Sequence, residues 1–375
     1  MEKSSLSENL FPYVTESRLR PVTTLNGKDY LYFAGTGYYQ LQSNKEVVEA
    51  AVDAVRKYGI SSATSRTING STPLILKLEN RLAQFFQAED AAYLPSGYLS
   101  NLAGFQALDA LGVYDVIFID ELAHYSNMAG ARATGKKVVR FRHLDEKDLE
   151  KKIEKKAGKG LRPLIVSDGL FPIWAEIPPV PAYLQLAEKY DGAVWVDDAH
   201  GAGILGENGR GVYEHFGLVS PRLFGGGTLS KAFGAYGGFV TGNAGFIQAV
   251  KTGDVMRGTN SPPAALAGAA LRGLELVKNN PELRKRLRSN SLYLKEKIKG
   301  IGIETDQTDL PIVTFSYESA EKMQEIQKKL MEKGIYIQFV KYVGSGADGV
   351  LRMVVSSAHS KAEIDFLVSM LRKIL

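Results

Sequence analysis

Lys231 is the residue whose surroundings most clearly suggest chemistry. It lies in "GTLSKAFGAYGG" (227–238), where its neighbours are small, hydroxylated or glycine and almost none is charged. A lysine that is kept away from water has a lowered pKa, so its neutral amine can act as a nucleophile. The glycines allow the backbone to lie close to a bound molecule. A surface lysine in a glycine-rich loop remains the alternative.

Acidic and histidine side chains follow two of the predicted strands. Asp197, Asp198 and His200 come directly after "AVWV", and His124 follows "DVIFID". Catalytic groups in open α/β sheets gather at the C-terminal ends of the strands, so we expect these side chains to lie close together. An aspartate can also simply cap a turn. His124 can cap a helix instead of stacking on an aromatic ligand.

The stretch "SGY" (96–98) lies between the predicted strand "AAYL" and a helix. Backbone N–H groups at such a helix start bind phosphate, although many ordinary helix caps have the same residues. A phosphate cradle, a stacking histidine, an aspartate and a nucleophilic lysine together are what pyridoxal 5′-phosphate needs. Lys231 would form a Schiff base with the cofactor aldehyde. Asp197 would keep the ring nitrogen protonated, so that the ring accepts the electrons of a substrate carbanion.

Short apolar runs alternate with amphipathic helical segments from about residue 45 to residue 260. These runs are "AAYL", "DVIFID", "KVVRFR", "PLIVSDG", "AVWVDD" and "GGFVTG". The alternation predicts a mostly parallel sheet that is covered by helices on both faces. Ser360 and Glu363 predict a capping box on the last helix. We therefore predict an N-terminal arm (1–44), a large α/β domain (45–275) and a small C-terminal α+β domain (276–375).

Composition narrows the class of protein. The chain has 375 residues, a net charge of +5 and no cysteine. The absence of cysteine excludes disulfides and thiolate metal sites, and the charge is too small and dispersed to indicate nucleic-acid binding. The first residues have no apolar signal core, and no run of about 18 apolar residues occurs. We expect a cytoplasmic protein with no membrane span, no bound metal and no nucleic-acid partner.

The sequence resembles the α-oxoamine synthases, which are fold-type I pyridoxal-phosphate enzymes. The strongest matches are "VDDAHGAGILGENGRG" (196–211) and "TLSKAFGAYGG" (228–238), with support from "SGYLSN", "DELAHYS", "SPPA" and "LRMVVSSAH". The resemblance covers about residues 25–375. It implies the aspartate aminotransferase-like fold and a homodimer whose subunits share their active sites. It also implies an amino acid and an acyl thioester as substrates.

The resemblance assigns roles to individual residues. Lys231 would carry the cofactor, Asp197 would pair with its ring nitrogen, and His200 would lie near its phenolic oxygen. His124 would stack on the ring. The phosphate region would be held by Ser96, Gly97, Tyr98 and Thr228, with Thr259 reaching across from a partner subunit. Arg352 would bind the carboxylate of the amino acid through a two-pronged contact.

The family reaction follows from these roles. An amino acid displaces Lys231 from the cofactor and loses its α-proton, the resulting carbanion attacks the acyl thioester, and carbon dioxide leaves. The product is an α-amino ketone, and Lys231 is the expected proton carrier. A mildly basic surface would suit the phosphates of coenzyme A.

The sequence departs from the family pattern on the substrate side. A Ser-Met-Asp-Gly stretch, whose serine contacts the phenolic oxygen, is replaced by "PIWA" (172–175). The segment 61–75 lacks the usual histidine, and Arg257 stands where an aromatic residue is common. Thr36 takes the place of an asparagine near the substrate carboxylate. The cofactor residues match the family, whereas the substrate contacts differ.

Three readings of the function therefore stay open. The first is an α-oxoamine synthase, with alanine, glycine or serine as the amino donor and an acyl group on coenzyme A or a carrier protein. The second keeps the cofactor but performs aminotransferase or aldolase chemistry. The third is an inactive partner subunit, which the presence of Lys231 argues against.

Overall fold

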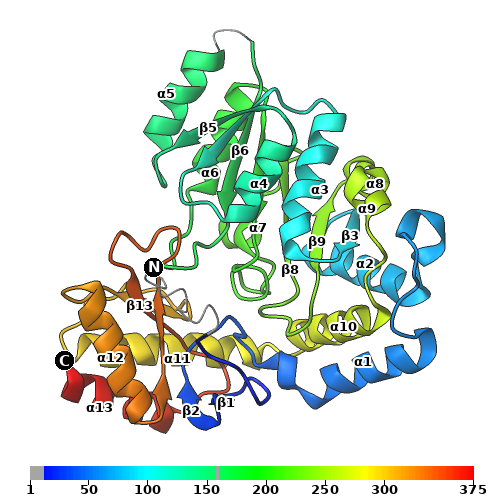
Figure 1. The fold of residues 1–375 in the computed structure, drawn as a ribbon. Helices are drawn as coiled ribbons and strands as arrows, with labels where there is room; N and C mark the ends of the chain where they lie inside the picture. The colour runs from blue at the N-terminus through cyan, green and yellow to red at the C-terminus, as the bar shows by residue number, and fades with distance from the viewer. Residues whose placement is uncertain (1–11, 158–159) are drawn as a thin grey trace, which may run out of the picture.

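The computed structural model describes residues 12–157 and 160–375. Figure 1 shows a large domain built around one sheet and a smaller C-terminal domain below it. Among the described residues, every helix is too short or too polar to cross a lipid bilayer.

The large sheet has seven strands among the described residues. They are β3 (Asp90–Leu94), β4 (Val116–Asp120), β5 (Lys137–Phe141), β6 (Pro163–Asp168), β7 (Ala193–Asp197), β8 (Leu223–Thr228) and β9 (Gly238–Gly242). Their spatial order is β3-β9-β8-β7-β6-β4-β5, and β9 runs antiparallel to both of its neighbours. The pairs from β5 to β8 are parallel, so these strands bring their C-terminal ends to the same edge of the sheet. The predicted mostly parallel sheet is confirmed.

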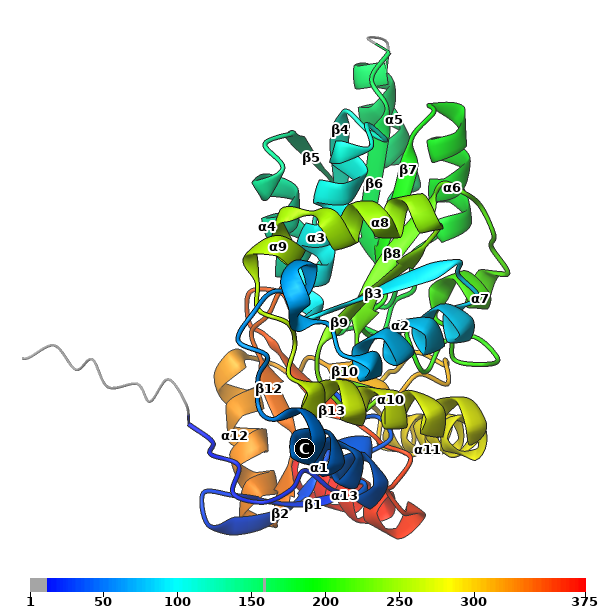
Figure 2. The same cartoon turned by 90° about the vertical axis from the view of Figure 1, so that its right-hand side faces the viewer.

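Helices cover both faces of this sheet. One face carries α3 (Gly97–Ala110), α4 (Tyr125–Ala133), α8 (Ala244–Thr252) and α9 (Asp254–Gly258). The other carries α2 (Pro73–Phe86), α5 (Glu146–Ala157), α6 (Val180–Lys189), α7 (Val212–Phe216) and α10 (Ala264–Asn279), with α1 (Lys45–Tyr58) packed on α10. Figure 2 shows α3 and α4 on one side of the sheet and α6 on the other. Short helical turns occur at η1 (Leu41–Ser43) and η2 (Arg66–Gly70).

Alternating side chains of the central strands enter the two cores. Phe118 and Val196 pack into one apolar cluster, whereas Ile117 and Trp195 pack into the cluster on the opposite face. Because both faces are buried, these strands are apolar along their whole length instead of alternating with polar residues. This explains why they were recognisable as continuous apolar runs.

Strand β8 was not predicted, because its centre is a glycine triplet. A Cβ on Gly225 would lie 2.7 Å from the carbonyl oxygen of Val196, and one on Gly226 would lie 2.6 Å from that of Phe239. Neighbouring strands therefore approach β8 more closely than a side chain would allow. Glycine is depleted in strands, so local propensity gave no sign of a strand here.

The C-terminal domain combines a three-stranded sheet with helices. The strands are β10 (Ile312–Phe315), β12 (Gln338–Val340) and β13 (Val350–Val354), and the helices are α11 (Glu282–Lys299), α12 (Ala320–Glu332) and α13 (Lys361–Ile374). The capping box of Ser360 and Glu363 at the start of α13 is confirmed.

The N-terminal strands belong spatially to the C-terminal domain. Strands β1 (Val22–Leu25) and β2 (Lys28–Tyr32) form a hairpin, and β2 pairs in parallel with β11 (Ile335–Tyr336). Phe33 continues into the core of the same domain. The three predicted domain boundaries stay a prediction, and residues 1–11 of the predicted arm lie outside the described residues.

Candidate active site

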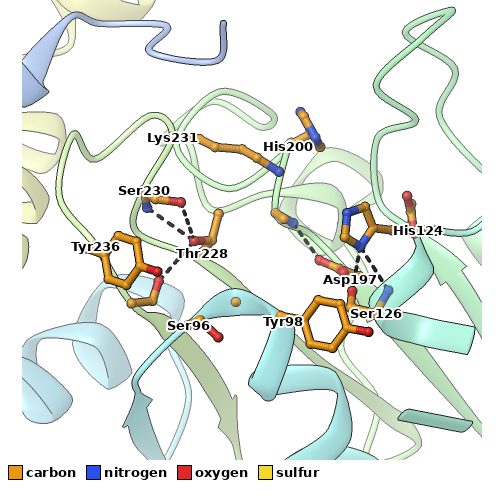
Figure 3. Close-up of a pocket in the computed structure, with 14 residues that line it drawn as sticks. Ser96, Tyr98, His124, Ser126, Asp197, His200, Thr228, Ser230, Lys231 and Tyr236 are labelled. Carbon is orange, nitrogen blue, oxygen red and sulfur yellow. Dashed lines mark hydrogen bonds between the residues drawn. The ribbon is translucent and has the colours of Figure 1, made fainter. Parts of the chain in front are cut away.

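A cavity of about 210 Å³ opens at the C-terminal edge of the large sheet. Its walls come from the ends of β3, β4, β6, β7 and β8. The lining residues are Ser96, Gly97, Tyr98, His124, Ser126, Asp168, Asp197, Ala199, His200, Thr228, Ser230, Lys231, Tyr236 and Gly237. Figure 3 shows Lys231 and His124 pointing into the same space near Asp197. The structure therefore brings together eight sequence-predicted residues: Ser96, Gly97, Tyr98, His124, Asp197, His200, Thr228 and Lys231.

The N-terminus of α3 forms one end of this cavity. Ser96 caps the helix, because its hydroxyl accepts a hydrogen bond from the backbone N–H of Leu99 at 3.3 Å. Opposite it, Thr228 shares a hydrogen bond with Ser230 at 2.7 Å. A Cβ on Gly97 would lie only 2.8 Å from Thr228 Cβ, so glycine is needed for this close approach. Free N–H groups at a helix start, together with hydroxyls, form a suitable site for a phosphate group.

Asp197 is held by a buried amide network that the sequence interpretation missed. Asn101 donates to Asp197 Oδ2 at 2.6 Å and to Ser126 Oγ at 2.8 Å, while its own oxygen accepts from Trp195 Nε1 at 2.9 Å. The backbone N–H of Ala199 donates to Asp197 Oδ1 at 3.1 Å. These bonds fix the direction of the carboxylate. Asn101 was visible in the stretch "SGYLSN", but its spacing gave no sign that it reaches another strand.

His124 is oriented by the same network. Its Nδ1 lies 2.6 Å from Ser126 Oγ and accepts from the Ser126 backbone N–H at 3.2 Å. Burial lowers the pKa of His124, the carboxylate of Asp197 acts in the opposite direction, and Lys231 lowers it further. A neutral imidazole is therefore presented as a flat face to the cavity.

Asp168 is a second buried carboxylate that sequence interpretation missed. It ends β6 and lies in register beside Asp197 at the end of β7. Its Oδ1 accepts from the backbone N–H of His124 at 3.0 Å and from Asn127 Nδ2 at 2.9 Å. Burial and the charge of Asp197 raise the pKa of Asp168 well above its ordinary value. Its position directly after a buried strand was the available signal.

Lys231 is chemically distinct from a surface lysine. Burial lowers its pKa to about 8, although the carboxylates of Asp197 and Asp168 act to raise it. A larger fraction of this amine is therefore neutral near physiological pH, as a nucleophile requires. The functional interpretation of the opening stretch is thus favoured over an exposed lysine.

His200 lies beside Lys231 in the lining of the cavity (Figure 3). Tyr38 OH lies 2.8 Å from His200 Nδ1, and both side chains are buried. Burial, then the charges of Lys231 and Arg352, hold the pKa of His200 well below its ordinary value. His200 is therefore a neutral hydrogen-bonding group.

A second cavity of about 310 Å³ adjoins the first, sharing His124, His200 and Lys231 with it. The remaining lining residues are Gly35, Thr36, Pro172, Ile173, Gln338, Val340, Tyr342 and Arg352. Arg352 donates from Nε to the carbonyl oxygen of Pro172 at 2.7 Å and from Nη1 to Gln338 Oε1 at 3.3 Å. Both predicted substrate residues, Arg352 and Thr36, lie here.

Thr259 lies elsewhere within this chain. It follows α9, and its hydroxyl donates to the carbonyl oxygen of Val255 at 2.6 Å. Among the described residues it is not part of the lining of either cavity. Its predicted role concerns a partner's site, so that role stays a prediction.

The cavity suits pyridoxal 5′-phosphate at three separate points. The start of α3, with its required glycine, would suit a phosphate. The buried carboxylate of Asp197 suits a protonated ring nitrogen, since a buried charge needs a partner. Lys231 supplies an amine with a lowered pKa for the aldehyde.

Comparisons with known proteins agree with this geometry. The model of the aminotransferase class I and II family matches residues 34–371. The 8-amino-7-oxononanoate synthase of Alkaliphilus metalliredigens is 34% identical over 354 residues, covering 93% of this chain and 89% of the relative. The protein of the same name from Thermosipho melanesiensis is 35% identical over 374 residues, covering 98% and 94%.

A solved structure shows the same architecture. The serine palmitoyltransferase of S. paucimobilis with a bound PLP–myriocin aldimine superposes with a TM-score of 0.91 at 27% identity, covering 97% of this chain and 92% of that one. The sequence matches, the fold and the cavity therefore lead to the same assignment. The chain belongs to the class I and II aminotransferase family of pyridoxal-phosphate enzymes, and within it to the α-oxoamine synthases.

Proposed function

We propose that this protein condenses an amino acid with an acyl thioester, with loss of carbon dioxide, to give an α-amino ketone. The relatives named 8-amino-7-oxononanoate synthase support alanine and a carboxylate-bearing acyl chain as the substrates. The observation that carries the proposal is the convergence of Lys231, Asp197 and the start of α3 on one cavity that opens into a second one containing Arg352.

The chain's own residues have separate tasks in this reaction. Pyridoxal 5′-phosphate, when bound, supplies an electron-accepting ring that stabilises a carbanion at the amino acid α-carbon. Asp197 would hold the ring nitrogen in its protonated form. Ser96, Gly97 and Thr228 would position the phosphate, with Tyr98 beside them. His124 would cover one face of the ring.

Lys231 and Arg352 act on the amino acid itself. Arg352 binds the carboxylate, and Lys231 removes the proton from the α-carbon. This carbon forms its bond with the acyl carbonyl, the thiol leaves, and the carboxyl group departs as carbon dioxide. Lys231 then returns a proton to the same carbon. Neutral His200, which is hydrogen-bonded to Tyr38, forms part of the wall of both cavities. Thr36 would lie near the substrate carboxylate.

We also propose a cytoplasmic homodimer in which each subunit contributes to its partner's site. Exposed aromatic side chains surround the cavity, with Tyr98 at 51% and Tyr236 at 50% exposure. A second subunit that covered them would bury apolar surface and exclude water from the reaction. Thr259 would then reach the phosphate of the partner's cofactor.

The test uses purified protein loaded with pyridoxal 5′-phosphate. We expect the cofactor absorbance to change when alanine is added, and free thiol to appear when a dicarboxylic monoacyl thioester follows. Glycine and serine, with the same thioester and with long-chain acyl thioesters, test the reactions of related enzymes. Amino transfer to a keto acid without thiol release would contradict the proposal and indicate an aminotransferase. Lys231→Ala should lose the lysine-linked absorbance and all turnover.

A further inference from the structure

The loop 341–349, which joins β12 to β13, brings Tyr342 to the second cavity. Gly344, Gly346 and Gly349 have φ values of +88°, +74° and +78°, which L side chains rarely adopt. Buried Ser345 fixes the turn. The Tyr342 N–H donates to Ser345 Oγ at 2.9 Å, and the Ser345 N–H and hydroxyl donate to the Tyr342 carbonyl at 2.9 and 2.8 Å. The backbone of Tyr342 is therefore held in one position.

The segment 172–174 supports this loop from the large domain. Trp174 Nε1 donates to the carbonyl oxygen of Gly344 at 2.9 Å. The segment is itself anchored to the C-terminal domain, since the carbonyl of Ile173 accepts from Thr314 Oγ1 at 2.5 Å. This is where the sequence departs from the pattern that it resembles. Trp174 stands where that pattern has aspartate, and its indole supports the opposite loop.

The ring of Tyr342 lies between an exposed residue, Tyr125, and a residue that lines both cavities, His124. It packs edge-on against Tyr125, with the ring centres 5.3 Å apart at 81°, and lies 6.3 Å from the ring of His124. Tyr125 is 55% exposed, whereas His124 lines both cavities. Burial raises the pKa of Tyr342 to about 12, so its phenol carries no charge. The ring therefore adds bulk and no charge to this wall.

We propose that Tyr342 is a specificity-determining residue whose ring limits the width of the passage for the acyl thioester. The inference rests on the proposed function. The amino acid binds further in, at Arg352, so the second substrate has to pass the outer wall that Tyr342 forms. A ring carried on a backbone that Ser345 fixes and Trp174 supports admits an unbranched chain and excludes a branched one. Steric selection of this kind changes kcat/KM by about 10- to 200-fold.

The first test compares thioesters with unbranched and with branched acyl chains. Wild-type protein should prefer the unbranched chain, and Tyr342→Ala should reduce this preference about tenfold or more. Tyr342→Phe keeps the ring and should keep the preference. The dissociation constant of the amino acid should stay the same in all three proteins. An unchanged preference in Tyr342→Ala, or a lost preference in Tyr342→Phe, would overturn the inference.

A second test does not depend on the enzymatic reaction. Hydrazine and the bulkier phenylhydrazine would both attack the imine carbon that joins the bound cofactor to Lys231, forming a hydrazone and releasing the lysine amine, and the rates can be followed by absorbance. Tyr342→Ala should raise the rate of the phenylhydrazine reaction about tenfold relative to that of the hydrazine reaction. Trp174→Phe, which loses only the bond to Gly344, should raise this ratio by a smaller factor. Equal ratios in wild type and Tyr342→Ala would refute a steric role.

The two tests separate the two proposals. If wild-type protein releases no thiol from any thioester, the proposed function fails, while the hydrazine ratio still measures the passage. Cofactor content and thermal unfolding of each variant show whether it is folded. Should Tyr342→Ala not fold, Tyr342→Leu removes the ring with a smaller loss of volume, and the same outcomes apply to it.

Discussion

Asn101 Nδ2 lies 2.6 Å from Asp197 Oδ2, and through this contact a helix on one face of the sheet orients the carboxylate at its edge. The same side chain accepts from Trp195 and donates to Ser126, which contacts His124. One amide thus sets the directions of two groups in the cavity, although it is not part of the cavity lining.

Asn101→Ala should therefore lower stability and impair cofactor binding together. It leaves Trp195 Nε1 and one oxygen of Asp197 without this partner, and each unsatisfied buried group costs about 1–3 kcal/mol. Chemical unfolding and cofactor titration measure the two effects. Asn279→Ala, at the exposed end of α10, is the control and should change stability by less than about 0.5 kcal/mol. Normal cofactor affinity in Asn101→Ala would contradict the orienting role.

The attachment of the cofactor should depend on the pKa of Lys231. Because burial lowers this pKa to about 8, the rate at which cofactor-free protein takes up the aldehyde should rise with pH and level off above about 8. Stopped-flow absorbance measures it, with N-acetyl-lysine as the reference amine. Asp168→Asn removes a carboxylate that raises the pKa of Lys231, so the midpoint of the rate against pH should lie at a lower pH. An uptake rate that still rises steeply at pH 10 would show that Lys231 has the pKa of an ordinary lysine.

His359 should make the protein sensitive to acid. It is 3% exposed, stacks on Phe33 at 4.2 Å, and its Nδ1 accepts from the Ser356 N–H at 2.9 Å. Burial lowers its pKa to about 4, against about 6.5 in the unfolded chain. The unfolded state binds the proton first, so this contribution is present above pH 6.5 and falls by roughly 3 kcal/mol as the pH drops to 4.

The measurement for His359 is the free energy of unfolding against pH. His359→Asn should lose this part of the dependence between pH 6.5 and 4, while His215→Gln, an exposed histidine on α7, should keep it. Parallel curves for wild type and His359→Asn would show that protonation of this ring does not matter.

Arg352→Lys should weaken the binding of the amino acid. The planar guanidinium is held by Pro172 and Gln338, and an ammonium group cannot reproduce both contacts and a carboxylate bond. We expect KM for the amino acid to rise about tenfold or more. Binding of the corresponding amine, which has no carboxylate, should change little. An unchanged KM would remove Arg352 from the substrate site.

The sequence predicted those parts of the structure that leave a local pattern. Buried parallel strands are apolar runs, and chemistry at their ends follows from topology, so Asp197, His200 and Lys231 were found together. The start of the last helix at Ser360 was also identified correctly. These features depend on neighbours within a few residues.

The missed features depend on residues far apart in the chain. Asn101 contacts Asp197 across 96 positions, and the sequence around either residue contains no pattern that predicts this contact. Strand β8 is formed by glycines because the neighbouring backbones approach closely, which is a property of the sheet and not of the triplet itself. The pairing of β2 with β11 likewise gives no local signal.

That last pairing has a consequence for how the protein is made. Residues 28–32 leave the ribosome well before their partner at 335–336 has been translated. The three-stranded sheet of β1, β2 and β11 therefore cannot form until residues 335–336 have been made, and one edge of the hairpin stays open until then. During that interval it is exposed to chaperones, and a nascent chain truncated before β11 should be captured by them.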